Sequence, residues 1–193
     1  VQPLIFLSAD HLIEKANKFI YEIKKNKKYL TNNNIFIFGI KPYSPSDQFG
    51  YFISKKVKNL YCVSQFLEKP NIKKAKKIIK KGGYWNSGIF FLRKDALVNN
   101  FKKFQKKMYK NSLLSIEKGK LKKNIYYLNR KEFDKNPTKS FDIAILEKTK
   151  DIKAVKINIS WSDLGSWKEI LLMFNKNKKR YYNKNNTFIR PWG

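Results

Sequence analysis

Carboxylates are scarce in this chain, so the places where they occur are informative. The 193 residues include 43 Lys and Arg but only 14 Asp and Glu. Asp10 follows the apolar run 4–7, and Asp163 lies in a predicted loop between Trp161 and Gly165. Two carboxylates at one edge of a sheet could share a hard divalent cation such as Mg²⁺. For Asp10 taken alone, an N-cap of the following helix is the stronger interpretation, and Asp163 could likewise be a turn residue.

Two short motifs could recognise a phosphorylated sugar. In Glu68-Lys69-Pro70, at a predicted strand end, a carboxylate can accept sugar hydroxyls and an ammonium group can pair with phosphate. In Asn86-Ser87-Gly88, the amide can bond a hydroxyl and the glycine lets a ligand approach the backbone, as Gly50 also would. Each motif alone is also typical of an ordinary turn or β-bulge.

The single histidine and the single cysteine exclude several catalytic classes. His11 makes a His-rich zinc site and a Ser-His-Asp triad hard to defend, and we expect it to play a supporting part beside a site. Cys62 excludes an internal disulfide and alternates with apolar neighbours, which predicts a core position.

The formal charge of +29 raises the question of nucleic-acid binding. Nearly all of the excess is lysine, spread along the whole chain, whereas nucleic-acid readers rely on arginine for bidentate contacts. Lys, Asn and Ile share A/T-rich codons, so we interpret the charge as a solvated lysine surface. We therefore do not expect nucleic acid as a partner, and a lysine-rich nucleic-acid-binding module is the least favoured function.

The elements that must position these residues alternate between strands and helices. An apolar run, an amphipathic segment with helical spacing and a second apolar run fill the first forty residues, which predicts a parallel α/β sheet. No apolar run is long enough to cross a membrane and no signal peptide is present, so we expect a cytoplasmic protein without a membrane partner. We predict strands at 4–7, 35–40, 51–57, 60–66, 84–92 and 152–159, and helices at 12–23, 72–81, 94–107, within 108–139, at 140–148 and at 167–174.

Six motifs in this order resemble the mannose-1-phosphate guanylyltransferases, a branch of the sugar-nucleotide pyrophosphorylases that includes bifunctional bacterial guanylyltransferase/mannose-6-phosphate isomerases. The resemblance covers about residues 3–174, and its most specific parts are Trp-Asn-Ser-Gly and Trp-Ser-Asp-Leu-Gly-Ser-Trp. The motifs are Ser-Ala-Asp-His (8–11), Phe-Gly-Tyr-Phe-Ile (49–53), Phe-Leu-Glu-Lys-Pro (66–70), Tyr-Trp-Asn-Ser-Gly-Ile-Phe (84–90), Ser-Phe-Asp-Ile-Ala-Ile-Leu-Glu-Lys-Thr (140–149) and the Trp-Ser-Asp motif (161–167).

The resemblance implies an α/β, Rossmann-like nucleotide-diphospho-sugar transferase fold with a mixed, mostly parallel sheet and flanking helices. It implies a nucleotidyltransferase domain over 1–174, a linker over 175–186 and the start of a cupin-type isomerase domain over 187–193. The implied reaction is Mg²⁺-dependent in-line attack of mannose 1-phosphate on the α-phosphate of GTP, giving GDP-mannose and pyrophosphate. The implied site residues are Asp10 and Asp163 on the metal, Gly50, Glu68, Asn86, Ser87 and Gly88 at the sugar, Lys69 at the phosphate, and Asp142 in support.

One departure from the family pattern shapes these expectations. The glycine-rich loop that cradles the nucleotide phosphates is absent from these residues. We therefore expect an internal fragment that lacks the N-terminal part of the family pattern and is inactive by itself. Alternatives are a pyrophosphorylase for another sugar 1-phosphate, such as glucose, and a non-catalytic regulatory subunit; a homo-oligomer is compatible with the sequence.

Overall fold

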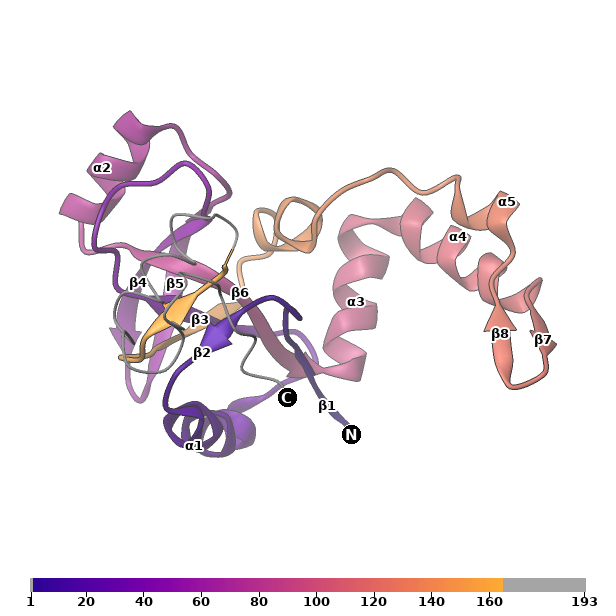
Figure 1. Cartoon of the computed structure of the whole chain (residues 1–193), viewed down its shortest axis with the longest axis horizontal. Helices are drawn as coiled ribbons and strands as arrows, with labels where there is room; N and C mark the ends of the chain where they lie inside the picture. The colour runs from indigo at the N-terminus through magenta and orange to yellow at the C-terminus, as the bar shows by residue number, and fades with distance from the viewer. Residues whose placement is uncertain (1, 165–193) are drawn as a thin grey trace, which may run out of the picture.

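The computed structural model describes residues 2–164 (Figure 1). The predicted helix 167–174, the linker 175–186 and the segment 187–193 lie outside these residues. Within residues 2–164, no helix is long and apolar enough to cross a membrane. In chain order the elements are β1 (Pro3–Phe6), β2 (Leu12–Ile13), α1 (Ala16–Asn26), a 3₁₀ turn η1 (Lys27–Tyr29), β3 (Ile35–Ile40), β4 (Tyr51–Val57), β5 (Leu60–Leu67), α2 (Ile72–Lys80), β6 (Tyr84–Arg93), α3 (Lys94–Phe104), α4 (Lys106–Glu117), β7 (Lys120–Lys122), β8 (Ile125–Tyr127), α5 (Arg130–Phe133), a π-helical turn η2 (Asp142–Leu146), β9 (Ile152–Lys156) and β10 (Trp161–Ser162).

The main sheet is mixed but mostly antiparallel, so the prediction of a mostly parallel sheet is wrong. Its order is β1-β6-β3-β9-β5-β4, and only β3 and β9 pair in parallel. The strand–helix–strand unit β1-α1-β3 does form, but β6 inserts between its two strands and runs antiparallel to both. A short pairing of β4 with β6 closes the remaining strands into a ring.

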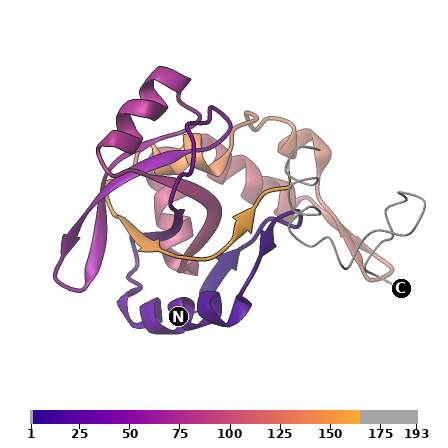
Figure 2. The same cartoon turned by 60° about the vertical axis from the view of Figure 1, so that its left-hand side comes forward.

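Strand β3 divides the core into two apolar clusters. All six of its residues are buried, and alternate side chains point to opposite faces of the sheet. Phe36 and Phe38 pack with residues of α1 and α2, whereas Ile35 and Ile37 pack with residues of α3 and η2. In Figure 2, α1 and α2 border the strands from opposite sides of the view. Helices on both faces explain why this strand reads as one continuous apolar run.

The structure corrects the expectations for two single residues, Asp10 and Cys62. Helix α1 begins at Ala16 with Lys15 as its N-cap, so Asp10 is not the N-cap of this helix. Cys62, expected in the core, is only half-buried, and Lys153 Nζ donates to its Sγ over 3.5 Å. Helix α2 is followed by Gly82, whose positive φ of 77° is typical of the residue just after a helix end.

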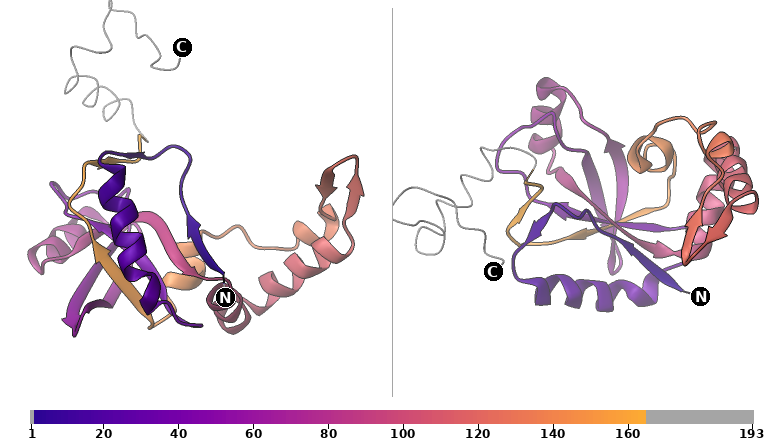
Figure 3. Two further views of the ribbon diagram at one scale, coloured as in Figure 1. Left: turned by 90° about the horizontal axis from the view of Figure 1, so that it is seen from below. Right: turned by 45° about the vertical axis from the view of Figure 1, so that its right-hand side comes forward.

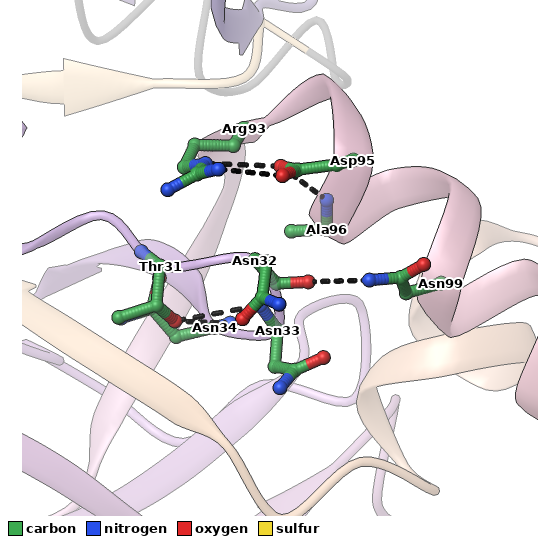
Figure 4. A network of polar contacts seen from close by, with 8 residues as sticks. All are labelled: Thr31, Asn32, Asn33, Asn34, Arg93, Asp95, Ala96 and Asn99. Carbon is green, nitrogen blue, oxygen red and sulfur yellow. Dashed lines mark hydrogen bonds and ion pairs between the residues drawn. The ribbon is translucent and has the colours of Figure 1, made fainter. Parts of the chain in front are cut away.

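Residues 94–139 form an arm that projects from the sheet (Figures 1 and 3). It contains α3, α4, α5 and the β7–β8 hairpin, so the region 108–139, expected to be partly helical, also contains two short strands. A hydrogen bond joins the base of the arm to the turn before β3 (Figure 4). Asn99 Nδ2 donates to the Asn32 carbonyl over 2.9 Å. Beside it, Arg93 pairs with Asp95 at 2.6 Å.

Candidate functional site

A cavity of about 310 Å³ gathers eight of the nine predicted site residues. Asp10 is the exception, since it is exposed in the turn between β1 and β2 and does not line the cavity. The lining residues are Ser8, His11, Gln48, Phe49, Gly50, Glu68, Lys69, Asn86, Ser87, Gly88, Ser140, Asp142, Trp161 and Asp163.

Asn86 lies at the centre of this arrangement because of its place on β6. Its backbone N–H donates to the Gly50 carbonyl over 2.7 Å, which ties β6 to the start of β4. Its side-chain Nδ2 donates to Asp142 Oδ1 over 2.8 Å, and its Oδ1 accepts the Gly88 N–H at 3.4 Å. The amide is therefore held in one orientation beside a carboxylate, which suits the recognition of a hydroxyl group.

Glycine is required at two positions of the cavity wall. A Cβ on Gly50 would lie 2.5 Å from Glu68 Oε2, so the carboxylate occupies the space that a side chain would need. Gly88 has a positive φ of 71°, and a Cβ there would face the ring of His11 at 3.5 Å. That a ligand approaches the backbone at these two glycines stays a prediction.

Two carboxyl groups of the cavity, those of Glu68 and Asp142, have raised pKa values. Burial, followed by the negative charge of Asp142, raises the pKa of Glu68 to about 7, while the Lys69 ammonium opposes this shift. Burial also raises the pKa of Asp142, against the hydrogen bond that it accepts from Asn86. Carboxyl groups crowded in this way are typical of binding and catalytic sites.

The two aspartates predicted to bind a metal flank a small separate sheet. Strand β2 pairs antiparallel with β10, with Ser162 opposite Leu12. Asp10 lies two residues before Leu12, and Asp163 directly follows Ser162, so both aspartates flank the paired residues. The chain thus brings together two loops that are about 150 residues apart in sequence. No group of three or more His, Cys, Asp and Glu side chains in residues 2–164 is arranged to hold a metal ion.

An aromatic wall borders the cavity on the side of β10. Trp161 contacts His11 edge-on, with ring centroids 5.3 Å apart, and Phe49 at 5.5 Å. Phe49 in turn packs on Trp85 at 4.7 Å. Within the described residues, His11 Nδ1, Ser87 Oγ and Trp161 Nε1 are buried without a hydrogen-bond partner. Such atoms could serve a ligand that enters the cavity.

Sequence reasoning missed several lining residues. The six motifs contain four lining residues for which the sequence predicts no role, namely Ser8, Phe49, Ser140 and Trp161. Gln48 lies just outside one of these motifs. Glu147, also inside a motif, accepts the Glu68 N–H through Oε1 at 3.1 Å. A usable signal was its position five residues after Asp142 in a chain that is poor in acids.

Comparisons with known proteins show the family to which the chain belongs. Residues 1–180 match the family model described as Nucleotidyl transferase. The chain is 32% identical over 176 residues to a mannose-1-phosphate guanylyltransferase of Salmonella montevideo. The alignment covers 86% of this chain and 37% of that protein. The chain therefore spans well under half the length of this relative.

Two solved structures share the fold. A structure titled mannose-6-phosphate isomerase, from Helicobacter pylori, matches with a TM-score of 0.74 and 29% identity, over 83% of this chain and 64% of that one. A structure titled mannose-1-phosphate geranyltransferase, from Thermus thermophilus, matches with a TM-score of 0.78 and 21% identity, over 89% and 49%. The resemblance seen in the motifs is confirmed at the level of the family, and the chain belongs to the nucleotidyl transferase family.

Proposed function

We propose that this chain supplies the sugar-phosphate-binding part of an enzyme that transfers a nucleotidyl group from GTP to mannose 1-phosphate. The products would be GDP-mannose and pyrophosphate. The observation that carries the proposal is the meeting of eight predicted residues, drawn from widely separated motifs, in one cavity. Mannose is chosen as the sugar because the similar proteins are named mannose-1-phosphate guanylyltransferases.

The cavity offers the groups that a sugar phosphate needs. Glu68 and the fixed amide of Asn86 can bond sugar hydroxyls, and the exposed Lys69 ammonium beside them can pair with the phosphate. In-line attack by the phosphate oxygen depends on positioning and on neutralising charge more than on an acid–base pair. A cavity wall fixed by hydrogen bonds is suited to that task.

The donor set also fits a magnesium ion. Mg²⁺ prefers carboxylate oxygens from one or two side chains, with substrate phosphates and water completing its shell. Asp10 and Asp163 would hold it, because the β2–β10 pairing brings their loops together. When bound, the ion would neutralise charge on the nucleotide phosphates. The chain's own contribution is the placement of these two carboxylates and of the sugar phosphate.

Calorimetric titration with mannose 1-phosphate tests the proposal. We expect this chain to bind it, and we expect Asn86→Ala to weaken binding about 10-fold or more through loss of the fixed amide. Asn99→Ala, on the arm, is the matched control and should bind as the unaltered chain does. No binding to the unaltered chain, or equal binding of both variants, would overturn the proposal.

The metal assignment has a separate readout. Mn²⁺ used as a probe, followed by electron paramagnetic resonance, should bind to the unaltered chain and lose affinity in Asp163→Asn and in Asp10→Asn. Asp134→Asn is the control, because Asp134 lies in the arm beside Arg130. If all three variants retain the unaltered affinity for Mn²⁺, these aspartates do not hold the metal.

Two further measurements address the alternatives. Equal or tighter binding of glucose 1-phosphate would favour a pyrophosphorylase for glucose. We propose that the chain alone, given GTP, Mg²⁺ and mannose 1-phosphate, shows no turnover. GDP-mannose formation at an ordinary enzymatic rate of about 1 s⁻¹ or more would refute that part.

A further inference from the structure

Glu147 connects two segments of the site that are far apart in sequence. Its Oε1 accepts the backbone N–H of Glu68 at 3.1 Å, across 79 residues of chain. Glu68 directly follows β5, and Glu147 directly follows η2. This bond therefore joins the end of a sheet strand to the turn that carries Asp142.

The π-helical turn explains how both acidic residues of this segment face the same neighbour. The Glu147 N–H donates to the Asp142 carbonyl five residues earlier, at 2.9 Å. In an α-helix, residues five apart point about 140° away from each other. The wider π turn reduces that separation, and π turns occur frequently at functional sites. The charges of Asp142 and Glu147 consequently both act on Glu68.

The residue after Glu68 adopts a backbone conformation that needs support from its surroundings. Lys69 has a φ of 41°, in the left-handed region that a lysine rarely occupies. Such a conformation costs free energy and persists only where neighbouring contacts fix it. Pro70, which is buried, follows directly, and Glu147 fixes the preceding amide. The turn is thus held on both sides of Lys69.

We infer that Glu147 is a positioning residue that holds the Glu68–Lys69 turn so that both side chains face the sugar-phosphate cavity. This inference rests on the proposed function, because it assigns Glu68 and Lys69 to the ligand. Glu147 itself is exposed and does not line the cavity. It acts through the turn and through its charge.

The charge of Glu147 gives the inference a pH signature. Glu68 lies among Asp142 and Glu147 from the η2 segment and Lys69 from its own turn; the ionisable groups lining the cavity from the β2 and β10 side are His11 and Asp163. The negative charge of Glu147 contributes to the raised pKa of Glu68. Its removal should lower that pKa, so Glu68 stays ionised to a lower pH.

Two substitutions separate the geometric effect from the charge effect. Glu147→Ala removes both the acceptor and the charge, and should weaken mannose 1-phosphate binding about threefold to tenfold at neutral pH. Glu147→Gln keeps an acceptor oxygen, and should restore most of that affinity while shifting the acid limb of the affinity–pH profile to lower pH. Glu117→Gln, at the end of α4, is the matched control. The ligand's own phosphate titrates identically in every comparison.

A second readout needs no ligand. Carbon-13 NMR of the Glu68 carboxyl should give a lower pKa in both Glu147 variants, and only Glu147→Ala should shift the Glu68 amide resonance strongly. If the unaltered chain binds no mannose 1-phosphate, the proposed function fails, whereas these NMR shifts still report on the turn. If the chain binds and both Glu147 variants match it in affinity, pH profile and Glu68 pKa, the inference is overturned.

Discussion

Replacing Gly50 with alanine should damage binding while leaving the fold intact. The added Cβ would lie 2.5 Å from Glu68 Oε2, and 3.4 Å from atoms of Asn86 and Phe66. The 2.5 Å contact cannot persist, and its partner is the free end of a flexible side chain. We therefore expect the Glu68 carboxylate to rotate away and the backbone to stay in place.

The structure sets the size of both effects. A hydrogen bond to a charged group contributes about 1.5–3 kcal/mol, so displacement of the carboxylate should weaken mannose 1-phosphate binding about 10- to 100-fold. The free energy of unfolding should change by less than about 1 kcal/mol, because alanine also restricts the unfolded chain. Gly39→Ala gives the opposite result, since its Cβ would meet the buried ring of Phe52. Overpacking there should cost about 1–3 kcal/mol of stability.

Calorimetry for binding and urea unfolding for stability, measured on the same preparations, distinguish the two variants. An unchanged affinity in Gly50→Ala would show that the Glu68 carboxylate does not contact the ligand. A large loss of stability in the same variant would show that Glu68 cannot move, and the reasoning from its flexible end would be wrong.

Three further substitutions test the electrostatics and the arm. The pKa of Glu68 is raised from 4.5 to about 7, so the contribution of Glu68 to stability is present at low pH and is lost as pH rises through that window. At pH 8, Glu68→Gln should therefore be more stable than the unaltered chain by about 1 kcal/mol, after allowance for solvent screening. Urea unfolding at pH 8 measures this difference. Hydrogen bonds from two lysines lower the pKa of Glu132 to about 2, so Glu132→Gln should lower the melting temperature at pH 7, and this difference should vanish as pH falls from 4.5 through 2. Asn100 is buried and its Nδ2 donates to the Asn33 carbonyl at 3.0 Å, so Asn100→Ala should cost about 1–3 kcal/mol in urea unfolding without altering ligand binding.

Local patterns in the sequence predicted the strands well but not their directions. The run 35–40 is apolar at nearly every position, and the structure buries all six residues. Pairing depends on which strands meet, however, and that choice is made between distant segments. Strand β6 enters between β1 and β3 from more than 40 residues away, so the expected parallel arrangement of neighbouring strands was wrong.

The candidate site was predictable where its residues stand in recognisable motifs. Asn86 and Glu68 were found because their polar side chains interrupt apolar strands or end them. Glu147 was not, because its role depends on a π turn and on a bond across 79 residues, which no local pattern encodes. The separation of Asp10 from the cavity likewise depends on a turn whose shape the sequence does not specify.

The two-residue pairing of β2 with β10 has a consequence for how the site opens. It consists of only two residue pairs and forms a sheet separate from the main one, so very few hydrogen bonds hold it closed. The buried strands of the ring, in contrast, are covered by helices. The aspartate loops should therefore separate in local openings that leave the sheet intact, and amide hydrogens of Ile13 and Ser162 should exchange with solvent much faster than those of β3.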